Sequence, residues 1–302
     1  MSVLNDKYYD SASRARRIVW DFFKPVFEDR WGKFAITVLG VYVLIGIVGP
    51  YLPIPGPFEY LQTSSGQYAQ LEPPSREFPL GTTYLGYGVL SQTIHSFRTS
   101  LTVGVLSAVL VVTIGVNIGL VSGYYGGKVD TLLMGLTDLA YGLPFYPMAI
   151  ILVAIFGSGL YTLAVVIALL FWRSVARVTR SETLTLRERE FVKSAKAAGS
   201  SDVKIMYYHL LPNLLPLILI YFVFAITWGI LLEASLSFIG LGNPDTVSWG
   251  LMLHEVFGSG ELTRAWWWVV VPSFTLWLFI WSLYVVARTL EDNATVSAKG
   301  GA

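Results

Sequence analysis

Long stretches without a charged residue limit the fold of this chain more than any other feature. Charged residues are absent from four long ranges: 34–52, 101–125, 139–172 and 265–287. A fifth range, 214–239, contains Glu233 as its only charged residue. A helix needs about 20 apolar residues to cross the hydrocarbon core of a bilayer. The pattern therefore predicts an all-α fold in a polytopic membrane protein.

Composition supports this prediction and excludes several other classes. Only 14% of the 302 residues are charged, whereas a soluble domain carries about 25%. The net charge of +1 gives no basis for nucleic-acid binding. Cysteine is absent, which excludes disulfides, thiol catalysis and Cys-based zinc sites.

The count of spans depends on residues 139–172. This run of 34 residues is too short for two full spans and is interrupted by Gly157-Ser158-Gly159. We interpret it as a helical hairpin over roughly residues 130–155 and 160–178, which places Asp138 or Arg173 at membrane depth. The sequence thus predicts six transmembrane helices, the first at 34–52 and five more in a core over 98–288. The sixth is entered through Trp266, Trp267 and Trp268, which are typical of an aromatic belt at the membrane interface.

Basic residues predict the orientation of these helices. If the N-terminus lies inside the cell, 18 of the 21 lysines and arginines fall on the inner side, and only Arg76, Arg98 and Arg264 fall outside. This asymmetry follows the positive-inside rule and predicts that both termini are inside. Residues 1–33 and 289–302 then form cytoplasmic segments, and residues 53–97 form an exterior loop long enough to be functional. Residues 18–27 are either a helix on the inner leaflet or a solvated leader.

The inner segment over residues 183–212 is the most informative one. Residues 183–198 favour a helix, and Gly199 suits the left-handed position that follows a helix end. Ser200 or Ser201 can then cap a second helix, which Pro212 would halt before the fifth span. The predicted product is a helix–glycine–helix elbow, which is either an ordinary connector or a docking element for another protein.

Four ordered segments carry a family resemblance. Residues 193–212 resemble the EAA loop of ATP-binding-cassette (ABC) importer permeases, and residues 73–86, 122–144 and 233–250 are similar to segments of the C-type subunit of the dipeptide/oligopeptide (peptide/nickel) subfamily. Two departures stand in the EAA loop itself, where Lys193 replaces the usual Glu and Ser194 replaces an Ala. Glu190, one turn earlier, could supply the carboxylate or pair with Lys193.

The resemblance implies an architecture and a set of partners. The architecture is that of type I ABC importer permeases, in a prokaryotic plasma membrane. The partners are a second homologous permease, two cytoplasmic ATPases and an exterior solute-binding protein, with membrane lipid around the spans and no nucleic acid. The implied ATPase-coupling residues are Glu190, Lys193, Ser194, Ala195, Gly199, His209, Leu211 and Pro212. The subunit is then not an enzyme, and no catalytic, cofactor or metal residue is expected.

Polar residues within the spans are candidates for the translocation path. For Asp138 we favour a structural pairing with Arg173 or Arg177. Glu233 could either face the path or be bonded within the protein. Asn117, with Gly115 and Gly119 beside it, is more typical of a helix contact.

The predicted function is that of an importer permease subunit, with peptides as the expected solute and nickel or oligosaccharides as alternatives. A secondary transporter or channel subunit not driven by ATP is the second hypothesis. It would need inverted repeats or broken helices around a midplane site. A membrane scaffold that recruits a cytoplasmic partner through the elbow is the third.

Overall fold

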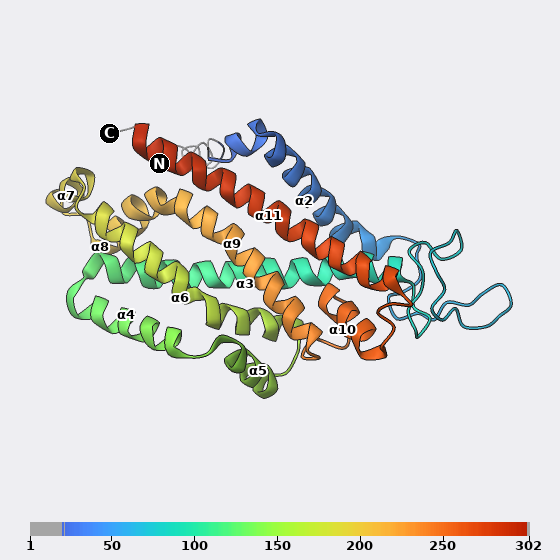
Figure 1. The fold of residues 1–302 in the computed structure, drawn as a ribbon. Coiled ribbons are helices and arrows are strands. Elements are labelled where there is room, and N and C mark those ends of the chain that lie inside the picture. Colours follow the sequence, from blue (N-terminus) through green and yellow to red (C-terminus); the bar gives the residue numbers. More distant parts are fainter. Residues whose placement is uncertain (1–19, 21, 301–302) are drawn as a thin grey trace, which may run out of the picture.

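The computed structural model describes residue 20, residues 22–293 in full and the backbone of residues 294–300. It shows an elongated bundle of helices (Figure 1). The main helices are α2 (Arg30–Val48), α3 (Val89–Tyr125), α4 (Gly127–Gly142), α5 (Phe145–Phe156), α6 (Leu160–Arg187), α7 (Glu190–Ala197), α8 (Asp202–Lys204), α9 (Leu211–Phe238), α10 (Trp249–Ser259) and α11 (Trp266–Gly300). Extended pairing in the described chain is limited to three isolated bridges between residues 60 and 88.

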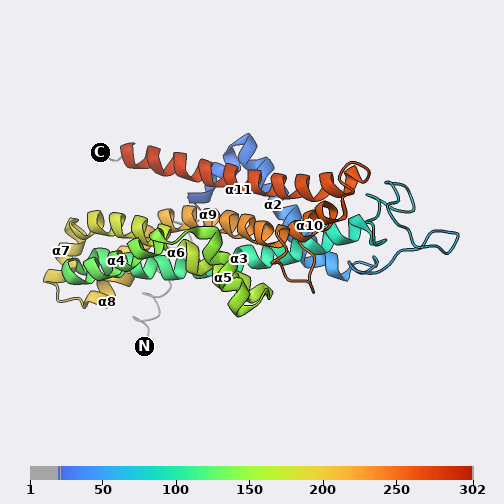
Figure 2. The same ribbon diagram turned by 60° about the horizontal axis from the view of Figure 1, so that its bottom comes forward.

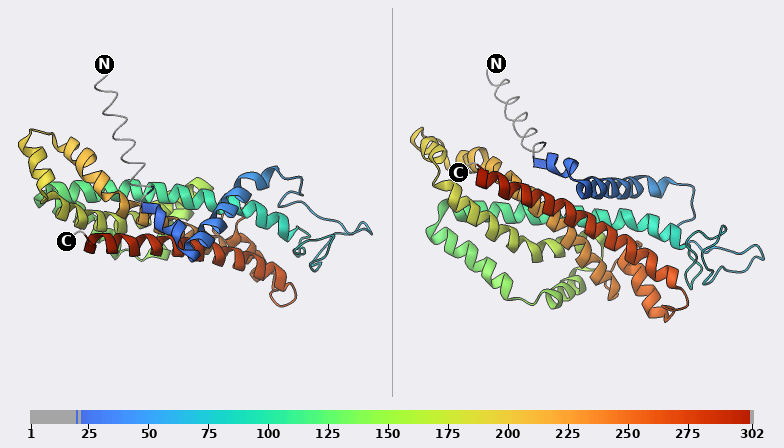
Figure 3. Two further views of the ribbon diagram at one scale, coloured as in Figure 1. Left: turned by 90° about the horizontal axis from the view of Figure 1, so that it is seen from above. Right: turned by 45° about the horizontal axis from the view of Figure 1, so that its top comes forward.

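The helices form layers with two distinct ends. Helices α2 and α11 pack together on one side, α4 and α5 lie on the opposite side, and α3, α6 and α9 fill the middle (Figures 1 and 2). One end carries the long loop over residues 52–88 and α10, and is called the loop end. The other end carries α7 and α8, and is called the elbow end (Figure 3).

Five helices of the described chain are long and apolar enough to cross a membrane, and the bent pair α4–α5 makes up to six. The stretches predicted from the sequence fall on these same elements. The predicted all-α, multi-pass class is therefore confirmed. The inside position of both termini stays a prediction, and residues 1–19 lie outside the described chain.

The predicted exterior loop over residues 53–97 is too long, because α3 begins at Val89. The first turns of α3 carry polar side chains that look like loop, yet Ser91, Gln92 and Ser96 are buried. They are covered by the folded loop and by α10, so this part of α3 continues beyond the apolar span. Over its 37 residues, α3 is about 55 Å long, well beyond the ~30 Å hydrocarbon core.

The third span is broken rather than continuous over residues 130–155. Helix α4 ends at Gly142, α5 begins at Phe145, and the two axes differ by 92°. The cause is local, since Pro144 cannot donate an N–H and restricts Leu143 before it to an extended conformation. Leu143 has φ −81° and ψ 129°, as this restriction requires.

Glycines bring α3 and α6 into close contact. Gly115, Gly119 and Gly123 lie four residues apart on α3 and face residues 172–183 of α6, where an added Cβ would meet backbone atoms at 2.4–2.9 Å. Small residues at this spacing let two helix backbones approach closely. The two glycines beside Asn117 thus form a helix contact, and the role of Asn117 itself stays a prediction. Its amide donates to the Thr113 carbonyl at 2.7 Å, within the same helix.

The loop end has its own apolar core, and this corrects one expectation about tryptophan. The sequence suggests that Trp266, Trp267 and Trp268 form an interfacial belt, but only Trp266 is exposed. Trp267 and Trp268 are buried with Val89, Met252 and other residues of the loop, α3 and α10. The Trp267 indole N–H also donates to the Thr82 carbonyl at 3.2 Å, so these rings fix the loop to α11.

The ends of the chain also differ from the sequence expectation. Residues 22–28 are helical, and Phe22 and Val26 are buried in the core shared by α2, α9 and α11. This segment is therefore packed against the bundle. Residues 289–300 continue α11, so the predicted tail is largely an extension of the sixth span.

Candidate functional site

The elbow end contains most of the residues expected to couple to a partner. Helix α6 stops at Arg187, and α7 follows after Glu188 and Arg189. Helix α7 closes with Gly199 at φ +74°. The Gly199 N–H donates to the Lys196 carbonyl at 2.9 Å, and the Ser200 N–H donates to the Ala195 carbonyl at 3.1 Å. These two bonds form a Schellman motif, which confirms the helix-ending position predicted for Gly199.

Two local predictions about the elbow are wrong. The helix expected over 183–198 is interrupted at Glu188–Arg189, where Arg189 is extended with ψ 149°. Pro212 does not halt the second helix, because α8 runs through a π-helical segment (Ile205–Leu210) directly into α9. Proline is tolerated at this place since N–H groups in a first turn have no partner within that helix. Ser201 occupies the N-cap position of α8 without a side-chain bond.

An apolar contact fixes α7 against the rest of the elbow. Val192 and Ala195 are buried against Ile205 and Met206, and the end of α3 completes this cluster with Leu120. Burial of this kind contributes about 25 cal/mol per Å² of apolar surface. The elbow is therefore a packed unit, in which α7 and the π-helical segment after α8 lie against the end of α3.

Polar contacts attach the same unit to α3. The Tyr124 hydroxyl donates to the Asp202 carboxylate (Oδ1) at 2.6 Å, and the Lys196 ammonium lies 5.0 Å from the centre of the Tyr124 ring. Arg187 donates to the carbonyls of Gly123 and Tyr124 at 3.1 and 3.2 Å. A cation at the C-terminal end of a helix is favourable because the last carbonyls carry partial negative charge.

A second arginine joins α6 to α4 near the elbow. Arg180 makes a two-point contact with the carboxylate of Asp130, which also accepts a hydrogen bond from Ser122. Such bidentate pairs fix geometry as well as charge. The elbow thus rests on a frame made by α3, α4 and α6.

The expected coupling residues divide between surface and interior. Glu190, Lys193, Ser194 and Gly199 are exposed, Ala195 is buried, and the remaining three are half-buried: His209, Leu211 and Pro212. The Glu190 carboxylate and the Lys193 ammonium are 3.6 Å apart, as the sequence suggested. This pair is on the surface and contributes little to stability.

Exposed apolar side chains were missed by the sequence reasoning. Phe191, Val203 and Tyr208 are exposed around the elbow, Val203 to 61%. Their apolar character in a polar segment was the available signal. Together with the exposed surface of α7, they give the elbow an apolar and charged face of the kind that docks in another protein's groove.

The intramembrane candidates lie in different surroundings. Asp138 is paired with Arg177 at 2.6 Å, which confirms the expected pairing. Glu233 is only 2% exposed, and one of its carboxylate oxygens accepts a hydrogen bond from Ser237 of the same helix at 2.7 Å. Its role in the path stays a prediction. Asn117 accepts a hydrogen bond from the Tyr207 hydroxyl at the elbow.

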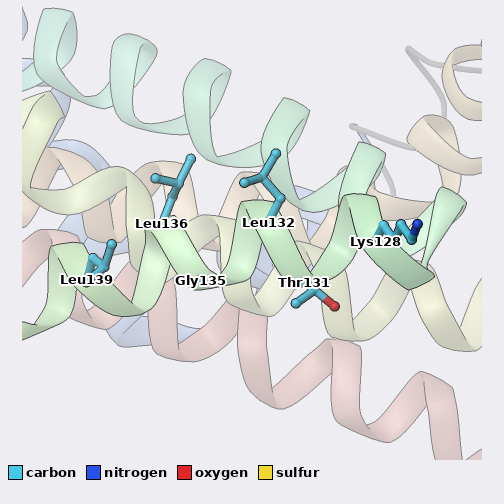
Figure 4. Close-up of a pocket in the computed structure, with 6 residues that line it drawn as sticks. All are labelled: Lys128, Thr131, Leu132, Gly135, Leu136 and Leu139. Atoms are coloured by element: carbon cyan, nitrogen blue, oxygen red, sulfur yellow. The ribbon is translucent and has the colours of Figure 1, made fainter.

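Helix α4 also borders a shallow hollow of about 600 Å³ on its outer face, lined by Lys128, Thr131, Leu132, Gly135, Leu136 and Leu139 (Figure 4). Within the described residues there is no cluster of three or more His, Asp or Glu side chains that could hold a metal ion.

Long apolar helices, a packed elbow at one end and a folded loop at the other define a multi-pass membrane protein. The chain belongs to the family of binding-protein-dependent transport system inner membrane components, whose model matches residues 115–295. Members of this family are non-catalytic permease subunits, and this chain is one of them.

Individual relatives cover most of the chain. It is 31% identical to the dipeptide transport system permease protein DppC of Bacillus subtilis, over 88% of this chain and 84% of that protein. It is 29% identical to the oligopeptide permease OppC of Haemophilus influenzae, over 95% and 91%. It is 33% identical to the glutathione permease GsiD of Pectobacterium atrosepticum, over 86% and 84%.

The fold is similar to that of an ABC importer. A chain of the inward-facing MetNI methionine ABC transporter superposes with a TM-score of 0.51 at 16% identity, over 66% of this chain and 96% of that chain. The expected importer permease architecture is therefore confirmed.

Proposed function

We propose that this chain is a permease subunit of an ATP-driven importer for peptides in a prokaryotic plasma membrane. The relatives named above are permeases for dipeptides, oligopeptides and glutathione, which all contain peptide bonds. A second homologous permease completes the path, two cytoplasmic ATPases drive it, and an exterior binding protein delivers the solute. The broken α4–α5 span is a feature that secondary transporters also use, but family membership favours the importer.

The elbow is the coupling element in this proposal. The single observation that carries the assignment is the packed elbow, which projects from the bundle (Figure 1). The orientation predicted from the sequence assigns the elbow to the same side as 18 of the 21 basic residues. This bias supports a cytoplasmic position of the elbow end. A short helix held in a moving groove displaces the helices at both of its ends, here α6 and α9.

Gly199 offers a direct test of the coupling role. An added side chain at Gly199 would meet nothing within 4 Å, so its left-handed conformation (φ +74°) is the only constraint. Valine in that conformation costs about 1–2 kcal/mol, whereas asparagine tolerates it. We expect Gly199→Val to insert normally but to lose ATP-dependent uptake, and Gly199→Asn to retain most of it.

The measurement uses the complete transporter in proteoliposomes, with binding protein outside and ATP inside. Undiminished uptake by Gly199→Val would refute the coupling role. Failure of the wild-type chain to retain any ATPase when co-expressed with its partner subunits would refute the importer assignment itself.

A further inference from the structure

The break between α4 and α5 gathers charged and aromatic side chains between α4 and α6. Pro144 has no N–H, so the Ala140 carbonyl, four residues earlier, loses its helical donor. An N–H of Arg173 from α6 donates to that carbonyl instead. The arginine thereby satisfies the polar group that the break exposes.

Tyr141 connects Arg173 to a second arginine. The guanidinium carbons of Arg173 and Arg177 lie 4.6 and 4.2 Å from the centre of the Tyr141 ring. The Tyr141 hydroxyl is 3.0 Å from the Ser174 hydroxyl, and Arg177 is paired with Asp138. These five side chains are called the break cluster.

The break cluster lies at membrane depth. Arg173 is the 14th residue of α6, counted from its start at Leu160, which is about 20 Å along the helix. Charged groups at such depth are costly unless they face protein or a water-filled path. The side chains of Arg177 and Asp138 are nevertheless 51% and 68% exposed in this chain. Their position therefore favours the translocation path or the second permease.

The chemistry of the cluster favours an anion. Two guanidinium groups face one carboxylate, which leaves one positive charge in excess. Within the described chain, each guanidinium places one of its five N–H donors in a hydrogen bond of this cluster. The remaining donors have the planar geometry that binds a carboxylate at two points.

We propose that Arg173 and Arg177 bind the carboxylate of the solute during passage, with the solute replacing Asp138 as the partner of Arg177. This inference rests on the proposed peptide transport and adds a contact site to it. The hollow along α4 ends at Leu139 (Figure 4), on the same helix as Asp138 and Tyr141, and its leucines offer a surface for apolar side chains of the solute.

The test compares trialanine, which has a free carboxylate, with trialanine amide, which has none. Uptake of each is measured in proteoliposomes with the complete transporter and saturating binding protein. The readout is the uptake rate of trialanine divided by that of trialanine amide. Each variant's ratio is compared with the wild-type ratio, so that any preference of the binding protein cancels. We expect Arg177→Gln and Arg173→Gln each to lower this ratio about tenfold, as for loss of a hydrogen bond to a charged group.

Two further variants separate binding from a structural role. Asp138→Asn removes the competitor for Arg177, so the ratio should stay at or above the wild-type value. Arg180→Gln is the matched control, since Arg180 lies on the same helix but is bound to Asp130; it should lower the uptake of both peptides equally.

An unchanged ratio in both arginine variants would overturn the inference. A ratio that falls as far in Asp138→Asn as in Arg177→Gln would also overturn it, because a purely structural ion pair is broken equally from either side. In each of these cases wild-type uptake still supports the proposed function. Absence of ATP-dependent uptake of either peptide by the wild type would instead refute the proposed function, and the inference with it.

Discussion

Replacing Gly119 by alanine should destabilise the bundle through its closest helix contact. An added Cβ would lie 2.4 Å from the Ala176 carbonyl oxygen, 2.7 Å from the Thr179 Cβ and 2.9 Å from the Arg180 nitrogen. Two of these atoms are backbone and cannot rotate away, so α6 must move. Overpacking of this kind costs up to about 3 kcal/mol, against about 1 kcal/mol gained from the helix propensity of alanine.

The net loss of about 2 kcal/mol corresponds to a fall in the thermal midpoint of about 5 °C. The assay is thermal unfolding of the purified transporter in detergent, followed by tryptophan fluorescence. Gly40→Ala is the matched control, because Gly40 also lies in a helix but an added Cβ meets nothing within 4 Å. We expect this control to be unchanged or slightly stabilised. A Gly119→Ala protein as stable as the Gly40→Ala protein would refute the packing argument.

Three other predictions concern the two ends of the bundle. Lys193→Glu restores the residue usual at this position, and we expect weaker retention of the ATPases in co-purification if they have changed to match Lys193. Tyr124→Phe removes the hydrogen bond to Asp202, so the local stability of the elbow should fall by about 1 kcal/mol. Amide hydrogens of the elbow should then exchange faster, and wild-type exchange rates would contradict this. Burial raises the pKa of Glu255, in α10, to about 6, whereas an unfolded Glu titrates near pH ~4.3. The folded state then binds its proton more tightly, so stability should fall as pH rises from about 4 to about 6, and Glu255→Gln should remove this part of the pH dependence of the thermal midpoint.

The sequence predicts the spans well because the property that makes a span is local. A run without charge reports its own transfer free energy into lipid, and no tertiary information is needed. The same logic fails at the loop end. Gln92 and Ser96 are polar but buried, since a loop and a short helix from other parts of the chain cover them. The assignment of Trp267 and Trp268 to the membrane interface was wrong for the same reason. The residues that bury them are distant in the sequence.

The elbow shows this limit within one segment. Gly199 was predictable, because a left-handed helix end favours glycine whatever surrounds it. The interruption at Glu188–Arg189 was not, because these residues favour helix locally. Burial of Val192 and Ala195 against the end of α3 requires α7 to leave the axis of α6. The pairing of Asp138 with an arginine was predictable, since a charge at membrane depth needs a partner. The break cluster was not predictable, because Tyr141 and the arginines meet only in the folded bundle.

The unbroken course of α3 has a mechanical consequence. It contains neither a proline nor a break over its 37 residues. Its first turns pack in the core of the loop end, and its last turn carries the elbow contacts of Tyr124. The neighbouring α4–α5 span is bent by 92°. Helix α3 therefore joins the loop end to the elbow end as one continuous element, whereas the span beside it offers a bend at which the bundle can change shape.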